Sequence, residues 1–320
     1  MEEDLRTFPE QLRWKPEIVN EKALRPVQQV VVVGMGGSHL SADVYRMLRR
    51  RVHMHVHTSY GLPHVSDELK EQTLVVLSSY SGNTTEVLDA YRNARKEKFL
   101  LAAVTSGGVL GNQAAEDGIP HIILPAATQP RMSIGYGVVA LAHLLRDTDL
   151  ITAFSDTAPL LSGSYKEEAS SYASWFEDTI PLIYAAHADF PLAYIWKIAF
   201  NETAKIPAFA NEFPELNHNE IEGFDVEPDK STYQKRFRGL FLLPTEEDER
   251  IEERMQKTAE IYKRRGVETR MFERAGKTRI ERVFKNILMA QWVAYELATL
   301  RGIDPEATPL IERFKKRLTH

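Results

Sequence analysis

Two short loops rich in glycine and hydroxyl side chains are the segments of this sequence best suited to bind an anion. The first is GMGGS at residues 34–38, and the second is SYSGNT at residues 79–84. Hydroxyl groups and backbone N–H groups at a helix N-terminus together form a ready anion site. Glycine lets the backbone approach such a ligand closely. The two loops are therefore candidates for a phosphate site, although each could also be an ordinary turn with a helix cap.

The same loops differ from the loops that bind nucleotides. No Lys follows in the GKS/T form, so the second loop is not a Walker loop, and GxGGS is not the dinucleotide pattern GxGxxG. The strand in which a ribose partner of NAD would stand ends in His57-Thr58-Ser59, without an acidic residue. We therefore expect no nucleotide cofactor.

The elements that position these loops follow the rhythm of a parallel α/β sheet, with apolar strands alternating with amphipathic helices. Five strands suit the doubly wound order 2-1-3-4-5, in which strands 1 and 3 are neighbours and ligands bind beyond their carboxyl ends. The two loops follow strands 1 and 3, so both should converge on that crevice. The predicted strands are Gln29–Val33, Val52–His57, Thr73–Ser78, Phe99–Thr105 and Pro120–Leu124, and the predicted helices are Ala42–Arg51, Thr84–Lys96 and Ile134–Arg146.

The second half of the sequence resembles the first, with elaborations. Residues 147–164 form a polar, helix-poor connection, which predicts one domain over residues 1–150 and another over residues 151–320. A long irregular stretch is expected over residues 206–225, and a final helix after Pro309. The other predicted elements are strands at Pro181–Ala185, Gly239–Leu243 and Glu268–Phe272, and helices over Lys166–Thr179, Ala193–Lys205, Glu246–Arg265 and Arg279–Thr299.

Composition limits the class of protein. The 320 residues are 43% hydrophobic and 27% charged, and no stretch approaches the roughly 18 apolar residues of a membrane span. A net charge of −5 argues against a nucleic-acid partner, which requires a basic surface. There is no cysteine, which excludes disulfides and thiol nucleophiles, and the acidic N-terminus lacks the pattern of a secretory signal. We expect a cytoplasmic protein.

Three histidines alternate along one predicted strand, which raises the alternative of a zinc site. His53, His55 and His57 share a strand face, but the outer pair would lie about 13 Å apart at ~3.3 Å per residue, too far to share one ion. We therefore expect no metal site.

The two loops resemble those of the sugar isomerase (SIS) domain, and almost the whole chain resembles the bifunctional phosphoglucose/phosphomannose isomerase family, built from two such domains. The second half carries the more specific motifs. The matching segments are Gln129-Pro130-Arg131, FNETAK at residues 200–205, PELNHN at residues 214–219, and the tail from Arg301-Gly302 through Ala307-Thr308-Pro309 to Lys315. His39 departs from the small residue that usually follows GMGGS.

The resemblance implies interconversion of fructose 6-phosphate with glucose 6-phosphate and mannose 6-phosphate through a cis-enediolate, without metal or cofactor. It implies Glu202 as the base, His218 as the ring-opening acid/base, Arg131 as the cation facing the enediolate, and Lys315 as an aid to ring opening. Thr308 would shape the pocket at C2 so that both epimers fit. His218 is expected to come from the partner in a homodimer. The residues expected to bind the sugar phosphate also include Gly36, Gly37, Ser38, Ser79, Ser81 and Thr84.

Simpler roles exist for each catalytic candidate. Glu202 could pair with Lys205, His218 could be a surface residue, Arg131 could form a salt bridge, and Lys315 could complement a helix C-terminus. Two other functions also remain open. One is an amino-sugar phosphate isomerase or deglycase with two SIS domains, and the other is a sugar-phosphate sensor that binds without turnover.

Overall fold

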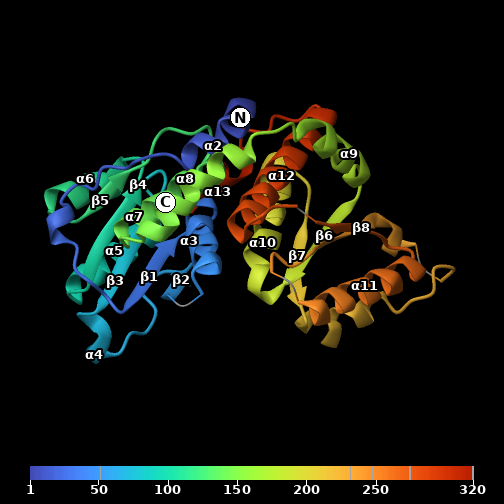
Figure 1. Cartoon of the computed structure of the whole chain (residues 1–320), viewed down its shortest axis with the longest axis horizontal. Coiled ribbons are helices and arrows are strands. Elements are labelled where there is room, and N and C mark those ends of the chain that lie inside the picture. Colours follow the sequence, from blue (N-terminus) through green and yellow to red (C-terminus); the bar gives the residue numbers. More distant parts are fainter. Residues whose placement is uncertain (51, 231, 247, 274, 319–320) are drawn as a thin grey trace. The chain divides into compact units, whose positions relative to one another are not determined.

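The computed structural model divides the chain into two compact units (Figure 1). It describes residues 1–50, 52–230, 232–246, 248–273 and 275–318. Arg6–Ser162 forms the first unit, and Gly163–His320 forms the second together with Met1–Leu5. The division therefore falls between residues 162 and 163, whereas the sequence placed it at residue 150.

The first unit contains a five-stranded parallel sheet in the order β2-β1-β3-β4-β5, which confirms the predicted fold class and strand order. Its strands are β1 (Gln29–Gly34), β2 (His53–His57), β3 (Thr73–Ser79), β4 (Leu100–Thr105) and β5 (His121–Ile123). Its helices are α2 (Phe8–Gln11), α3 (Gly37–Leu48), α4 (Asp67–Lys70), α5 (Thr85–Lys96), α6 (Gly108–Glu116), α7 (Ile134–Leu144) and α8 (Thr148–Thr157), and α1 (Glu2–Arg6) crosses the division between the units.

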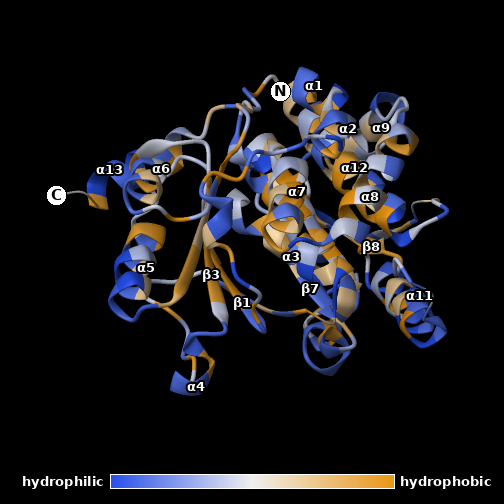
Figure 2. Ribbon diagram, turned by 60° about the vertical axis from the view of Figure 1, so that its left-hand side comes forward, coloured by the Kyte–Doolittle hydropathy of each residue, from blue (hydrophilic) through white to orange (hydrophobic). Residues whose placement is uncertain are grey.

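Branched apolar side chains explain why β1 and β3 lie at the centre of this sheet. Val31 of β1 is in register with Val75 of β3, and both are buried in a cluster with Val87 and Ala90 of α5. Strands covered on both faces read as continuous apolar runs, because each face is buried against helices. Figure 2 shows hydrophobic residues concentrated in β3 and in helices α7 and α12.

The second unit contains a four-stranded parallel sheet in the order β7-β6-β8-β9. Its strands are β6 (Ile180–Ala186), β7 (Phe209–Phe213), β8 (Phe237–Leu242) and β9 (Glu268–Phe272). Aromatic rings fill one side of this sheet, including Tyr184, Phe213, Phe241 and Tyr262. Its helices are α9 (Lys166–Phe176), α10 (Phe190–Ala199), α11 (Glu249–Arg264), α12 (Arg279–Leu300) and α13 (Pro309–Leu318).

Two local predictions were wrong. The supposedly helix-poor connection contains α8, which begins where the Asp147 carboxylate accepts a hydrogen bond from the backbone N–H of Leu150 at 3.1 Å. Leu150 and Phe154 are fully buried, so a capped apolar face forms this helix despite its polar appearance. The stretch expected to be irregular contains β7, an edge strand that pairs only with β6 in the described residues.

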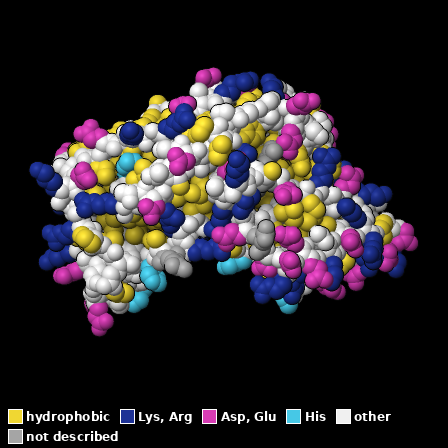
Figure 3. Space-filling view, viewed as in Figure 1, with side chains coloured by type: hydrophobic (Ala, Val, Ile, Leu, Met, Phe, Trp, Pro, Cys, Tyr) yellow, Lys and Arg dark blue, Asp and Glu magenta, His cyan; other side chains and the backbone are white. Residues whose placement is uncertain are grey.

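No helix in the described part of the chain combines the length and apolar character needed to cross a bilayer. On the face shown in Figure 3, acidic and basic side chains are interspersed.

Candidate active site

The two glycine- and serine-rich loops lie side by side beyond the carboxyl ends of β1 and β3 in the first unit. The Ser38 hydroxyl accepts a hydrogen bond from the backbone N–H of Tyr80 at 3.1 Å, and the Ser78 hydroxyl donates to the Ser38 carbonyl at 2.7 Å. The loops thus meet at the crevice where a doubly wound sheet binds ligands, as expected from the strand order.

The hydroxyl groups of the second loop differ in how accessible they are. Ser79 is fully buried, and its hydroxyl is hydrogen-bonded to that of Thr84 at 2.8 Å. The exposed Ser81 accepts a hydrogen bond from the backbone N–H of Asn83 at 3.2 Å. Gly82 has φ +68°, and a Cβ there would lie 1.9 Å from the carbonyl oxygen of Gly107. The loop geometry therefore requires glycine at position 82.

Arg131 lies next to the first loop, within the same unit. It belongs to the 3-10 turn Pro130–Met132 and is 3% exposed. A Cβ added to Gly37 would lie only 2.9 Å from the backbone nitrogen of Arg131. The second glycine of the GG pair thus permits the turn that carries Arg131 to approach the loop directly.

Tyr80 is a residue whose role the sequence did not reveal. Its phenol oxygen accepts a hydrogen bond from the backbone N–H of Ala127 at 2.5 Å and donates to the carbonyls of Ala127 and Pro125, at 3.1 and 3.4 Å. Tyr80 therefore ties the second loop to the segment that leads into Arg131. The tyrosine within SYSGNT was visible, but its partner is more than forty residues away in the sequence.

Glu202 lies in the second unit, on the π-helical turn Phe200–Ala204 that extends α10. Lys205 ends this turn with φ 55°, and the N–H groups of Lys205 and Ile206 both donate to the carbonyl of Phe200. The Asn201 amide donates to the Ile206 carbonyl at 2.9 Å, and Arg301 donates to the Ala204 carbonyl at 2.8 Å. Single π turns inside helices occur frequently at functional sites.

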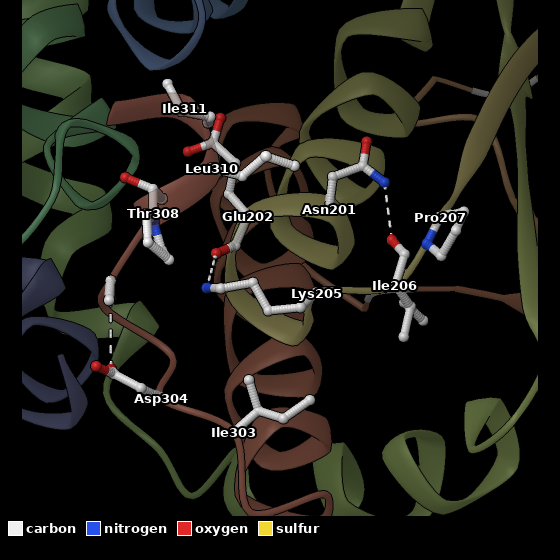
Figure 4. A pocket seen from close by; sticks show the side chains of 12 residues that line it. Asn201, Glu202, Lys205, Ile206, Pro207, Ile303, Asp304, Thr308, Leu310 and Ile311 are labelled. Atoms are coloured by element: carbon white, nitrogen blue, oxygen red, sulfur yellow. Dashed lines mark hydrogen bonds between the residues drawn. The ribbon is translucent and has the colours of Figure 1, made fainter. Parts of the chain in front are cut away.

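A pocket of about 690 Å³ opens beside this turn (Figure 4). Glu202 and Thr308, two of the residues singled out from the sequence, both line it, and so does Lys205. The ammonium of Lys205 donates to the main-chain carbonyl of Glu202, so this lysine supports the turn itself. A volume of this size is in the range of small-ligand sites.

Asp304 organises the other wall of the pocket. Its carboxylate accepts hydrogen bonds from the backbone N–H groups of Glu306 at 2.8 Å and Ala307 at 3.4 Å. These bonds, together with the positive charge of Lys205, lower the pKa of Asp304. The resulting turn leads into Thr308. An aspartate whose side chain bonds its own backbone two residues on is a turn signal, and the DPEA sequence at residues 304–307 contains it.

His218 and Lys315 lie apart from this pocket. Among the described residues, the lining of the pocket includes neither of them. His218 ends the 3-10 turn Glu215–His218 and is exposed, and Lys315 is exposed on α13.

The histidines considered for zinc do not form a metal site in the described residues, where no three His, Asp or Glu side chains are arranged to hold an ion. The ring centroids of His55 and His57 are 6.2 Å apart, and His57 Nε2 lies 3.2 Å from the Tyr60 carbonyl oxygen. His39, the departure noted in the first loop, is buried and its Nδ1 lies 2.7 Å from a carboxylate oxygen of Asp43.

The fold is that of the SIS class. Residues 165–318 match the model of the bacterial phospho-glucose isomerase C-terminal SIS domain. The solved C-terminal domain of glucosamine-fructose-6-phosphate aminotransferase from Francisella tularensis has the same fold, with a TM-score of 0.70 and 16% identity over 96% of this chain and 97% of that one.

Two relatives are similar to this chain over nearly its full length. Each is a bifunctional phosphoglucose/phosphomannose isomerase, one from Thermoplasma volcanium and one from Caldicellulosiruptor bescii. Each is 33% identical, covering 99% of this chain and 98% of the relative. The chain belongs to the bifunctional phosphoglucose/phosphomannose isomerase family, which confirms the family expected from the motifs.

Proposed function

We propose that the chain is a metal-independent aldose–ketose isomerase that interconverts fructose 6-phosphate with glucose 6-phosphate and mannose 6-phosphate. The observation that supports this most strongly is the pocket shared by Glu202 and Thr308 in a chain of this family. A carboxylate at a pocket of ligand size can move a proton, and the neighbouring threonine can shape the space around a reacting carbon. The proposed compartment is the cytoplasm.

The reaction sets three chemical tasks: opening the sugar ring, moving a proton between C1 and C2, and stabilising the enediolate oxygens. In our proposal Glu202 takes a proton from one carbon, the proton on its carboxyl group exchanges in part with water, and Glu202 then delivers a proton to the other carbon. Arg131 stabilises the negative charge, because a guanidinium stays protonated and presents two parallel donors. These steps balance without a metal ion or a redox cofactor.

The phosphate group would bind at the two loops of the first unit. Gly36, Gly37, Ser38, Ser81 and Thr84 are the proposed donors, while the buried Ser79 supports Thr84 through their hydroxyl hydrogen bond. The loops' location at the switch point supports this assignment.

Ring opening is assigned to His218 of the partner subunit in a homodimer, with Lys315 assisting. The support is that His218 is exposed and does not line the pocket of its own chain as described. An imidazole titrates near neutrality, so it can both give and take a proton.

The test supplies fructose 6-phosphate in excess chelator and quantifies both aldose phosphates. Glu202→Gln should lose both activities by at least about 100-fold, the scale of general base catalysis. Glu260→Gln is the matched control, because Glu260 is exposed on α11 and pairs only with Arg264 at 3.6 Å among the bonds described. Binding without turnover in the wild-type protein would contradict the enzyme and favour a sensor.

A further inference from the structure

The second sheet has its own topological switch point. Strand β6 lies between β7 and β8, as β1 lies between β2 and β3, and in both units the first strand leads through a helix to its outer neighbour. The loops after β6 and β8 therefore occupy the same places as the two glycine- and serine-rich loops of the first unit. In a doubly wound sheet these are the places from which ligands are bound.

A carboxylate of the chain itself occupies this position. Asp189, in the loop after β6, is 2% exposed. It accepts hydrogen bonds from the backbone N–H and the hydroxyl of Thr245, both at 2.7 Å, and from Arg279 at 3.1 Å. Thr245 lies in the loop after β8, so the bonds run from one loop to the other.

Asp189 also precedes α10 directly, where an aspartate ordinarily caps its own helix. In the described part of the chain its carboxylate does not bond the first turn of α10. It crosses to Thr245 instead, and Arg279 Nε donates to the same threonine hydroxyl at 3.1 Å. The guanidinium of Arg282 donates to the Thr245 carbonyl through Nη2 at 2.7 Å and through Nε at 2.9 Å. These bonds fix the loop that carries the N–H and hydroxyl donors of Thr245.

A backbone N–H, a hydroxyl and a guanidinium are the groups with which proteins bind small oxyanions. We propose that they form an anion site at the second switch point and that Asp189 fills this site as a built-in ligand. The second unit is thereby closed to phosphate esters. If the carboxylate is removed, the site takes a small carboxylate from solution.

Removing Asp189 leaves the Thr245 N–H without its acceptor and takes from Arg279 its buried carboxylate partner, while the exposed Glu246 still pairs with Arg279 at 3.3 Å. The loss of these buried bonds is destabilising. Formate is the probe, because it has the planar pair of oxygens that the aspartate presents. Asp189→Ala opens the space, whereas Asp189→Asn fills the same space with a neutral amide and is the matched control. The inference is independent of the proposed isomerase activity, because stability is the readout.

The experiment measures thermal midpoints in increasing sodium formate against sodium chloride at equal ionic strength. Asp189→Ala should unfold at a lower temperature than wild type and recover with formate concentration, while Asp189→Asn and wild type respond no more to formate than to chloride. An equal response of all three proteins would overturn the proposal. If Asp189→Ala does not fold in chloride, its refolding yield in formate is measured, and no recovery there would overturn it as well.

Discussion

Tyr80 joins the proposed phosphate site to the proposed electrostatic group of the reaction. Its backbone N–H bonds Ser38 in one loop, while its phenol bonds Ala127 in the segment that leads to Arg131. The two contacts use different parts of the residue. A substitution that removes only the phenol oxygen therefore separates positioning of Arg131 from binding of phosphate.

We expect Tyr80→Phe to lower kcat several-fold while KM for the sugar phosphate changes little, because the Ser38 contact remains. The lost hydrogen bonds should cost about 1 kcal/mol of unfolding free energy. Tyr91→Phe is the control, since that buried phenol donates to the Asp117 carboxylate and the Gln113 carbonyl, away from both loops. Steady-state kinetics measure kcat and KM separately. A wild-type kcat in Tyr80→Phe would refute the role of Tyr80 in positioning Arg131.

Helices and strands with a strong local hydrophobic pattern could be predicted from the sequence. Strands that form only because they pair with a neighbouring strand could not. Valine-rich β1 and β3 were clear, because buried parallel strands read as apolar runs. Strand β7 contains Asn211 and Glu212 and lies between Pro207 and Pro214, so its sequence looks like a loop. Its strand character depends on pairing with β6, which no local pattern reveals.

In the candidate site, too, some features could be predicted from the sequence and others depend on contacts from distant residues. The motifs identified Glu202 and Thr308, and the structure places both at one pocket. The helix predicted to run through Lys205 instead ends in a π turn, because Lys205 adopts a left-handed conformation and its N–H returns to Phe200. Such a turn depends on contacts from elsewhere, including the bond from Arg301 to Ala204, so helix propensity could not predict it.

At the scale of the whole molecule, the proposed homodimer makes a specific prediction about mixed chains. Glu202→Gln and His218→Ala should each be inactive alone. If His218 serves the partner's site, a mixed dimer retains one site with both native residues, so an equal mixture should recover about a quarter of wild-type activity after random exchange. Activity is assayed after the two variants exchange subunits.

Wild-type homodimers mixed with Glu202→Gln show whether exchange itself damages the sites, since their activity should fall only by dilution, and exchange is followed separately with chains that carry different tags. No recovery in the mixture of the two inactive variants, despite demonstrated exchange, would place His218 in the same chain's site, and full activity of His218→Ala alone would place it outside catalysis.

Proton transfer by Glu202 is the central claim, and deuterium exchange tests it most directly. The protein is incubated with fructose 6-phosphate in deuterated water until the sugar phosphates equilibrate, and label at C1 and C2 is measured by NMR. An enediolate mechanism predicts deuterium at C2 of both glucose 6-phosphate and mannose 6-phosphate with the wild-type protein, and none with Glu202→Gln over the same time. Exchange at the wild-type rate in Glu202→Gln, or interconversion without any exchange, would contradict it.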